Sequence, residues 1–391
     1  MQINETVAGT IRDIFPEPQG RPDYMILFVT ICLLIVGTVM IYSSSTIVAE
    51  QRYGNSLYFL KRQLIYAVLG VAALSVASRV PYQHWRKAAA AGMAISLMLL
   101  VLVFMPGLGV TINGARRWIK VAGFTFQVSE FVKIALVIFL AHFLVKKIEY
   151  GQQDIRKKFA VPLLVTALIT ALILMQPDFG TAVILVAVMM LLFYLAGIRL
   201  FYLICAAAAI IPAGVLLVIF ESYRLKRIFA FLHPWEDPQG AGFHIIQSFL
   251  CFGSGGAFGV GLGNSVQKLY YLPEPHTDFI FSIIGEECGF VGVSLVLILF
   301  AVLIVRGFKI AFATNDTFGS LLAAGITTII AMEVCINIAV VMGMLPTKGL
   351  VLPFVSYGGT SLVMSLAAVG VLLNISGQMK ADGTGVMRRT E

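Results

Sequence analysis

Long apolar runs separated by short polar segments dominate the chain. About 20 apolar residues are enough to cross the hydrocarbon core of a bilayer as one helix. We therefore predict an all-α polytopic membrane protein. Its ten transmembrane helices are expected at 24–45, 60–78, 88–105, 129–146, 160–176, 180–198, 200–220, 279–305, 319–343 and 354–379.

The remaining segments define the expected organisation. Residues 1–23 form an N-terminal tail, 24–379 the ten-helix membrane domain, and 380–391 a C-terminal tail. The segment 221–278, between the seventh and eighth spans, is predicted to be a large extracytoplasmic loop. Long loops in compact proteins are usually functional or disordered, and the aromatic residues of this loop favour folding back on the membrane.

Lys and Arg residues orient the spans, because cytoplasmic loops carry an excess of them. With the N-terminus inside, the inner segments hold 16 of the 28 Lys and Arg residues and the outer segments 11. The strongest signal is the segment 146–158, which holds five. Both tails are therefore placed in the cytoplasm.

Composition agrees with a membrane protein. Charged residues make up 12% of the chain, against about 25% in soluble domains. The net charge of +8 does not indicate nucleic acid, because the basic residues lie in short loops, where anionic membrane lipids are the expected partners. Neither the five cysteines nor the histidines show a metal-binding spacing.

The first of four polar clusters runs from Leu272 to Phe281. Asp278 lies where the eighth span begins, so the helix dipole would stabilise its carboxylate facing outer water. His276 precedes it. The alternative is that Thr277 or Asp278 simply caps the helix.

Two further clusters lie near the fourth to sixth spans. Glu130 and Lys133 are three residues apart and share a helix face. Ionisable groups within a span usually face a cavity or a partner, although a mutual ion pair without another role is the alternative. Gln176 and Asp178 lie in the tip between two spans, where Asp178 acting only as a helix cap is again the alternative.

The fourth cluster, 345–361, contains Lys348, Ser356 and Thr360. Its hydroxyls and backbone are suited to a polar ligand, and close helix packing through small residues is the alternative. All four clusters fall on the outer face, as does the segment 106–128 with its Arg116-Arg117-Trp118 sequence. Independent helix caps would occur on both faces, so we predict one outward-facing site for a phosphate-bearing substrate.

These residues resemble the SEDS family (shape, elongation, division and sporulation) of bacterial cell-wall glycosyltransferases. The most specific match runs from Gly263 to Lys268 and from Pro273 to Phe281. The sequence Pro346-Thr347-Lys348-Gly349 is similar to the division, FtsW-like branch rather than the elongation, RodA-like branch, and spore-specific members share much of it. Two positions depart from the family pattern. Val128 stands where the family usually has proline, and the Gly253–Gly256 stretch stands where relatives often carry charge.

The resemblance implies polymerisation of lipid II into β-1,4-linked glycan at the outer face of the bacterial cytoplasmic membrane, at the division septum. Asp278 matches the family's essential aspartate and would act as base or metal ligand. Mg²⁺ or another divalent cation is compatible with this chemistry, without an all-protein cage, and no organic cofactor is expected. The expected substrate-binding residues are Lys133 and Arg117 for the diphosphate, Trp118 for the sugar, Glu130 to orient Lys133, and Gln176, Asp178, His276, Lys348, Ser356 and Thr360.

The resemblance also implies a class B penicillin-binding protein as partner, together with other division proteins. A lipid II flippase or other transporter is the main alternative, since Glu333 lies in the middle of a span. A non-catalytic scaffold is a third hypothesis. Only the polymerase would make glycan in detergent.

Overall fold

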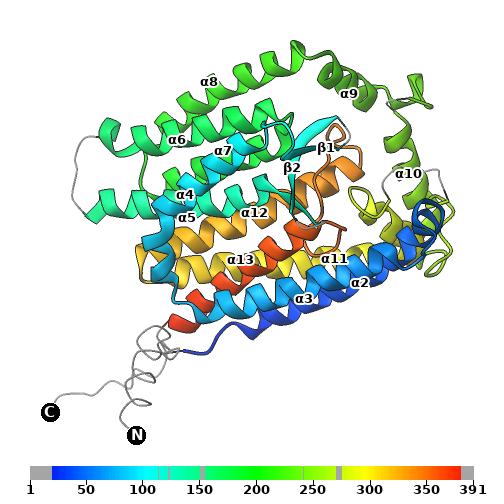
Figure 1. The fold of residues 1–391 in the computed structure, drawn as a ribbon, viewed down its shortest axis with the longest axis horizontal. Coiled ribbons are helices and arrows are strands. Elements are labelled where there is room, and N and C mark those ends of the chain that lie inside the picture. Colours follow the sequence, from blue (N-terminus) through cyan, green and yellow to red (C-terminus); the bar gives the residue numbers. More distant parts are fainter. Residues whose placement is uncertain are drawn as a thin grey trace, which may run out of the picture.

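The computed structural model describes residues 20–112, 114–121, 124–149, 155–240, 242–269 and 275–379. The predicted tails, apart from residues 20–23, therefore lie outside the described residues, as do Pro273 and Glu274. Within these ranges, a helix occupies each of the ten predicted spans, and Figure 1 shows them packed in one bundle. These helices are α2 (Tyr24–Tyr53), α3 (Tyr58–Arg79), α4 (Tyr82–Leu102), α5 (Val128–Glu149), α6 (Ile155–Met175), α7 (Phe179–Leu195), α8 (Leu200–Ile219), α11 (Ile280–Ala313), α12 (Thr317–Val341) and α13 (Gly359–Gln378).

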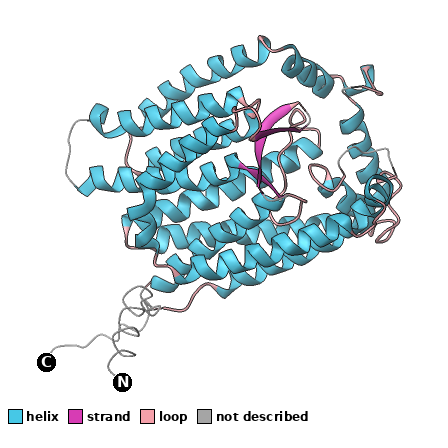
Figure 2. Ribbon diagram, viewed as in Figure 1, coloured by secondary structure: helices cyan, strands magenta, loops and turns pink. Residues whose placement is uncertain are grey.

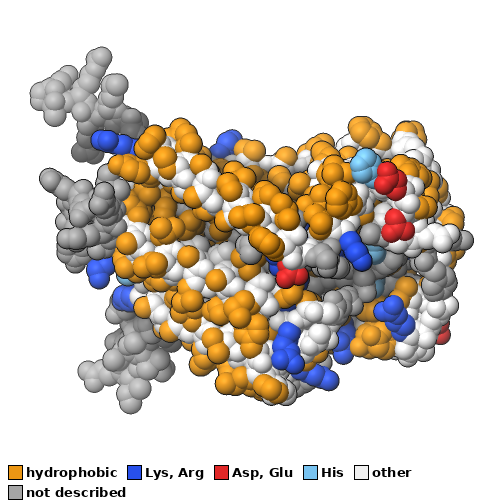
Figure 3. Space-filling model, turned by 90° about the horizontal axis from the view of Figure 1, so that it is seen from above, with side chains coloured by type: hydrophobic (Ala, Val, Ile, Leu, Met, Phe, Trp, Pro, Cys, Tyr) orange, Lys and Arg blue, Asp and Glu red, His pale blue; other side chains and the backbone are white. Residues whose placement is uncertain are grey.

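Seven of these helices are long and apolar enough to cross a membrane, namely α2, α3, α4, α5, α11, α12 and α13. The described apolar parts of α6, α7 and α8 are shorter. Large hydrophobic side chains such as Val68, Leu164 and Phe201 remain exposed on the outside of the bundle, and hydrophobic atoms cover much of the face shown in Figure 3. The chain is thus a multi-pass membrane protein, and the count of ten spans remains a prediction.

The two ends of the described chain meet at one end of the bundle, which we call the terminal end. The Gly20 amide donates to the Gly377 carbonyl at 2.8 Å, and Arg306 forms an ion pair with Asp23 at 2.8 Å. The opposite end is called the site end. The first and last described residues therefore lie at the same end of the bundle. That this side is cytoplasmic rests on the Lys and Arg distribution.

Two predicted loops at the site end contain regular structure. The chain between α4 and α5 forms an antiparallel sheet (Figure 2). Its strands, in spatial order, are β1 (Gly109–Ile112), β2 (Ala115–Val121) and β3 (Phe124–Gln127). The all-α prediction was wrong in this segment. The large loop holds helices α9 (Ser222–Leu232) and α10 (Phe243–Gly255) and a 3-10 turn, Pro234–Glu236. Backbone groups taken out of water must hydrogen-bond internally, and such short elements carry no long apolar run that reveals them.

The segment 257–268, upstream of Asp278, is fixed to α11. Gly289 interrupts α11 with φ 64°, and a Cβ atom there would lie 2.3 Å from the Gly259 amide nitrogen, so only glycine lets the loop cross here. The buried Glu286 carboxylate accepts a loop amide at 2.9 Å, and buried Glu287 pairs with Lys268 at 2.8 Å.

Candidate functional site

A cavity of about 280 Å³ lies at the site end, where the predicted polar clusters meet. Its walls come from β2, the turn before and first residues of α7, helix α9, and the segment 346–350 that precedes α13. The residues that line it are Arg117, Pro177, Asp178, Phe179, Gly180, Arg224, Arg227, Ile228, Pro346, Thr347, Lys348, Gly349 and Leu350. Four cations and one carboxylate therefore face the same space, which favours an anionic ligand.

A β-bulge directs Arg117 to one wall of this cavity. Pairing between β1 and β2 passes from Arg116 directly to Trp118, so Arg117 is the extra residue. Bulges commonly change the direction of a side chain. The Arg117 guanidinium donates to the Gln176 carbonyl at 3.0 Å and to the Pro177 carbonyl. The sheet thereby holds the turn between α6 and α7.

Asp178 caps α7 and also faces the cavity. Its carboxylate accepts the Thr181 amide at 3.2 Å and the Thr181 hydroxyl at 2.9 Å, so the capping role considered from sequence is present. Arg117 lies 3.9 Å away. The Lys348 ammonium stands 5.1 Å from the Phe179 ring centre. Burial lowers the pKa of Lys348, and the nearby Asp178 carboxylate opposes that effect. A second negative charge in the cavity would therefore further stabilise the charged form of this lysine.

Asp278 lies at the edge of this cavity. A Cβ atom built on the cavity residue Gly349 would lie 3.2 Å from Asp278 Oδ2, so the carboxylate faces this wall. The N-cap of α11 is Phe279 and not Thr277 or Asp278. Buried Asn337 of α12 donates to the backbone carbonyl of Asp278 at 3.1 Å and to that of Leu350 at 2.7 Å.

His276 and Ser356 lie behind the cavity and hold the Asp278 segment against the segment before α13. The Ser356 hydroxyl donates to the Thr277 carbonyl at 2.6 Å, and the Tyr357 amide donates to the His276 carbonyl at 2.9 Å. The His276 ring packs on Phe59 with 4.4 Å between ring centres. Burial lowers the pKa of His276 to about 4, so this imidazole is neutral at pH 7.

Lys133 lies in the interior of the bundle, outside the set of cavity-lining residues. Its ammonium contacts Glu130 at 2.9 Å and also Glu333 of α12. All three side chains are buried. The ion pair predicted between Glu130 and Lys133 is present, with Glu333 as an additional partner. Two carboxylates therefore satisfy the charge that was expected to contact the diphosphate.

The other predicted site residues also lie off the cavity wall. The Thr360 hydroxyl accepts the Gln127 amide at 3.2 Å and donates to the Thr125 carbonyl at 3.1 Å, tying α13 to β3. The Gln176 side chain donates to the Leu100 carbonyl at 3.2 Å. Trp118 is half-buried in the sheet, paired with Val110 and Gln127.

Arg224 and Arg227 of α9 line the cavity and were not predicted as site residues. They are three residues apart and therefore share one face of the helix. Arg227 also donates to the Thr347 carbonyl at 2.8 Å. Their helix lies in the large loop, more than 100 residues from Arg117 and Lys348 in either direction. The spacing of basic residues on a short amphipathic helix was the available signal.

A metal ion at this site would need ligands from the same part of the structure. Across the described part of the chain, no group of three or more His, Cys, Asp or Glu residues is placed to hold a metal ion. Mg²⁺ usually needs only one or two carboxylates, with water and substrate phosphates completing its shell. Asp278 beside a cavity lined by four cations fits that type of site.

Comparison with known proteins agrees with this arrangement. The family model for the cell cycle proteins FtsW, RodA and SpoVE matches residues 23–381. The probable peptidoglycan glycosyltransferase FtsW of Trichlorobacter lovleyi is 48% identical over 361 residues, covering 92% of this chain and 94% of that protein. The stage V sporulation protein E of Bacillus subtilis is 45% identical over 355 residues, covering 91% and 97%.

Solved structures show the same fold. A chain from a peptidoglycan synthase complex, described for its coordination of polymerization and crosslinking, superposes with a TM-score of 0.75 at 30% identity, covering 92% of this chain and 99% of that one. The rod shape determining protein RodA of Thermus thermophilus gives 0.69 at 28% identity, covering 92% and 98%. The chain belongs to the FtsW, RodA and SpoVE family of cell cycle proteins, as its resemblance to the SEDS glycosyltransferases predicted.

Proposed function

We propose that this protein is a peptidoglycan glycosyltransferase that polymerises lipid II into β-1,4-linked glycan for cell division. One observation carries the proposal. The Asp278 carboxylate faces Gly349 at the edge of a cavity whose walls hold Arg117, Arg224, Arg227 and Lys348. A carboxylate beside several cations is the arrangement needed to activate a hydroxyl while a diphosphate departs.

In the proposed reaction, the sugar 4-hydroxyl of one lipid II molecule attacks the anomeric carbon of a second molecule, which is the glycan donor. Asp278 accepts the hydroxyl proton as the new C–O bond forms. The bond between the anomeric carbon and the diphosphate oxygen breaks with inversion, and undecaprenyl diphosphate leaves. The cations of the cavity stabilise the negative charge that grows on the departing oxygen.

A divalent cation such as Mg²⁺ would supply further charge neutralisation to the diphosphate, and Asp278 is the residue that would hold it as the alternative to its role as base. The Asp178 carboxylate contacts Thr181 and Arg117 and caps α7. Asn337 and Ser356 act as positioning residues, since they fix the backbone on both sides of Asp278.

The partner and location follow from the same family. A relative of this fold is part of a peptidoglycan synthase complex, which supports a class B penicillin-binding protein as partner of this chain. The relatives named FtsW support a place at the division septum, together with other division proteins. The matching sporulation protein keeps a sporulation role as the second candidate within the same activity.

The test is polymerisation of lipid II in detergent by the protein purified with its penicillin-binding partner, in the presence of Mg²⁺. Asp278→Asn preserves the shape of the side chain and removes the base, so we expect glycan formation to fall by about 100-fold or more. Glu236→Gln, an exposed carboxylate in the same large loop, is the matched control and should retain activity. Equal glycan from the wild type and from Asp278→Asn would contradict the proposed base.

The same assay addresses the transporter and scaffold hypotheses, because neither predicts any glycan in detergent. Glu333 was the residue that favoured transport. Its contact with Lys133 explains a buried carboxylate in the middle of a helix without transport, since buried charges require partners.

A further inference from the structure

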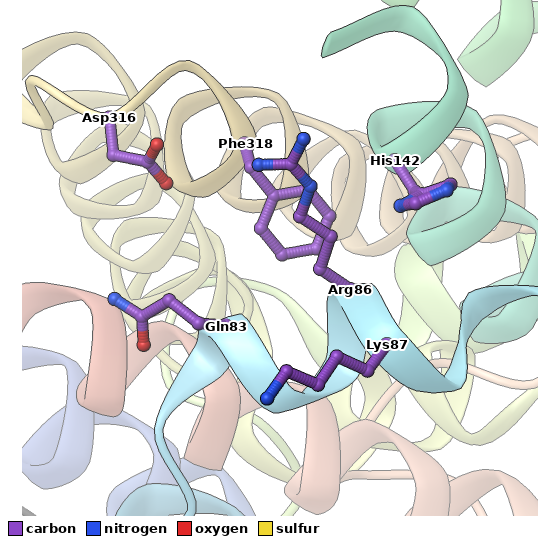
Figure 4. A pocket seen from close by; sticks show the side chains of 6 residues that line it. All are labelled: Gln83, Arg86, Lys87, His142, Asp316 and Phe318. Carbon is purple, nitrogen blue, oxygen red and sulfur yellow. The ribbon is translucent and has the colours of Figure 1, made fainter. Parts of the chain in front are cut away.

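A second cavity, of about 340 Å³, lies at the terminal end of the bundle and plays no part in the proposed reaction. Figure 4 shows the side chains that surround it, with Arg86 placed between Asp316 and His142 in this view. Three of its residues come from the first turns of α4, two from the start of α12, and one from α5. They are Gln83, Arg86, Lys87, His142, Asp316 and Phe318.

Charge and position restrict what this cavity can bind. Among the described residues that line it, Arg86 and Lys87 are the cations, and Asp316, which caps α12 through the Gly319 amide at 2.9 Å, is the carboxylate. Phe318 is buried and provides an apolar floor. An anion with an apolar portion fits such a lining better than a fully hydrated anion.

The surrounding helices place the cavity at the membrane boundary. Helix α4 buries only 22% of its most apolar window within the protein, so most of that helix is left for lipid. The cavity lies at the N-terminal ends of α4 and α12, at the same end of the bundle as Gly20 and Met379. The Lys and Arg distribution assigns this end to the cytoplasm, where the leaflet carries anionic lipids.

We propose that this cavity binds the phosphate headgroup of an anionic phospholipid of the inner leaflet. Arg86 and Lys87 would contact the phosphate, and the acyl chains would run along the exposed face of α4, while the Gln83 amide donates to Gln378 at 2.9 Å. Such a lipid would join α4 to α12. This site is separate from the proposed polymerase site, and the inference does not depend on that function.

Lipid binding can be measured by native mass spectrometry of the full-length protein in detergent, titrated with phosphatidylglycerol or with phosphatidylcholine. We expect preferential retention of phosphatidylglycerol, weakened about five-fold by each of Arg86→Gln and Lys87→Gln. Lys309→Gln, an exposed lysine at the same end but outside the cavity, is the matched control. Equal losses in all three variants would overturn the site in favour of a diffuse basic surface.

Asp316→Asn provides a test by gain of binding. Asparagine is as good a helix cap as aspartate, so α12 should be preserved while the charge that repels a phosphate is removed. We expect tighter binding of phosphatidylglycerol, and unchanged or weaker binding would contradict the proposal. Inorganic phosphate is the final arm. If it competes with the lipid at millimolar concentration, the cavity is a phosphate site rather than a lipid site.

Discussion

Lys133, Glu130 and Glu333 form a buried charge cluster. Replacing these residues by neutral ones distinguishes a structural role for Lys133 from a role in binding the diphosphate. Lys133→Met leaves Glu130 and Glu333 buried without their cation. Breaking a buried ion pair in this way costs about 3–5 kcal/mol. We therefore expect a clear fall in the free energy of unfolding and in polymerisation together.

The informative variant combines Lys133→Met with Glu130→Gln and Glu333→Gln. Replacing a whole buried charge cluster by neutral side chains is often neutral for stability, so most of the lost 3–5 kcal/mol should return. Stability would be measured by thermal unfolding in detergent and activity by glycan formation from lipid II. Because the lysine already has two carboxylate partners, we expect activity to return with stability.

Two outcomes would refute this reasoning. If the triple variant is as stable as the wild type but makes no glycan, Lys133 contacts the substrate, as the sequence analysis predicted. If Lys133→Met alone has wild-type stability, the three charges are not coupled in the way the contacts indicate. A conservative control is Lys133→Arg, which keeps the charge but changes its geometry.

Three further predictions concern the site end. Arg227→Gln should lower the apparent affinity for lipid II by about 10- to 100-fold, since a charge-assisted bond contributes about 1.5–3 kcal/mol. The control is Lys226→Gln, an exposed neighbour, which should change the affinity little. Equal effects of the two variants would exclude a specific cavity contact. Gly349→Ala should reduce glycan formation, because the new Cβ would lie 3.2 Å from Asp278 Oδ2, and wild-type turnover would show that this wall yields freely. Burial lowers the pKa of His276 to about 4 from its usual 6.5 or so. The neutral buried imidazole therefore contributes up to about 3 kcal/mol to the free energy of unfolding above about pH 6.5, and this contribution is lost as the pH falls towards 4. Unfolding of His276→Phe followed from pH 7 to 5 should therefore be less pH-dependent than that of the wild type, and identical pH profiles would contradict a neutral buried imidazole.

Much of the helical fold follows from the sequence alone. The apolar runs locate α2 to α8 and α11 to α13, because only a helix satisfies its own backbone in an apolar medium. Local spacing also predicts the contact between Glu130 and Lys133, since residues three apart share a helix face. A carboxylate where an apolar helix begins made Asp278 one candidate, with helix capping as the alternative, and the family resemblance gave it the catalytic role.

Only the tertiary structure decides which of these groups meet. Arg224 and Arg227 join Arg117 and Lys348 because α9 folds back over the site end, and no local pattern reports that approach. Glu333 lies 200 residues from Lys133, so sequence spacing could not reveal their contact. The small sheet is invisible to a search for apolar runs because hydrogen bonds between neighbouring strands, and not burial along one continuous segment, define it. Local periodicity fixes each helix, whereas long-range packing determines which charges share a cavity.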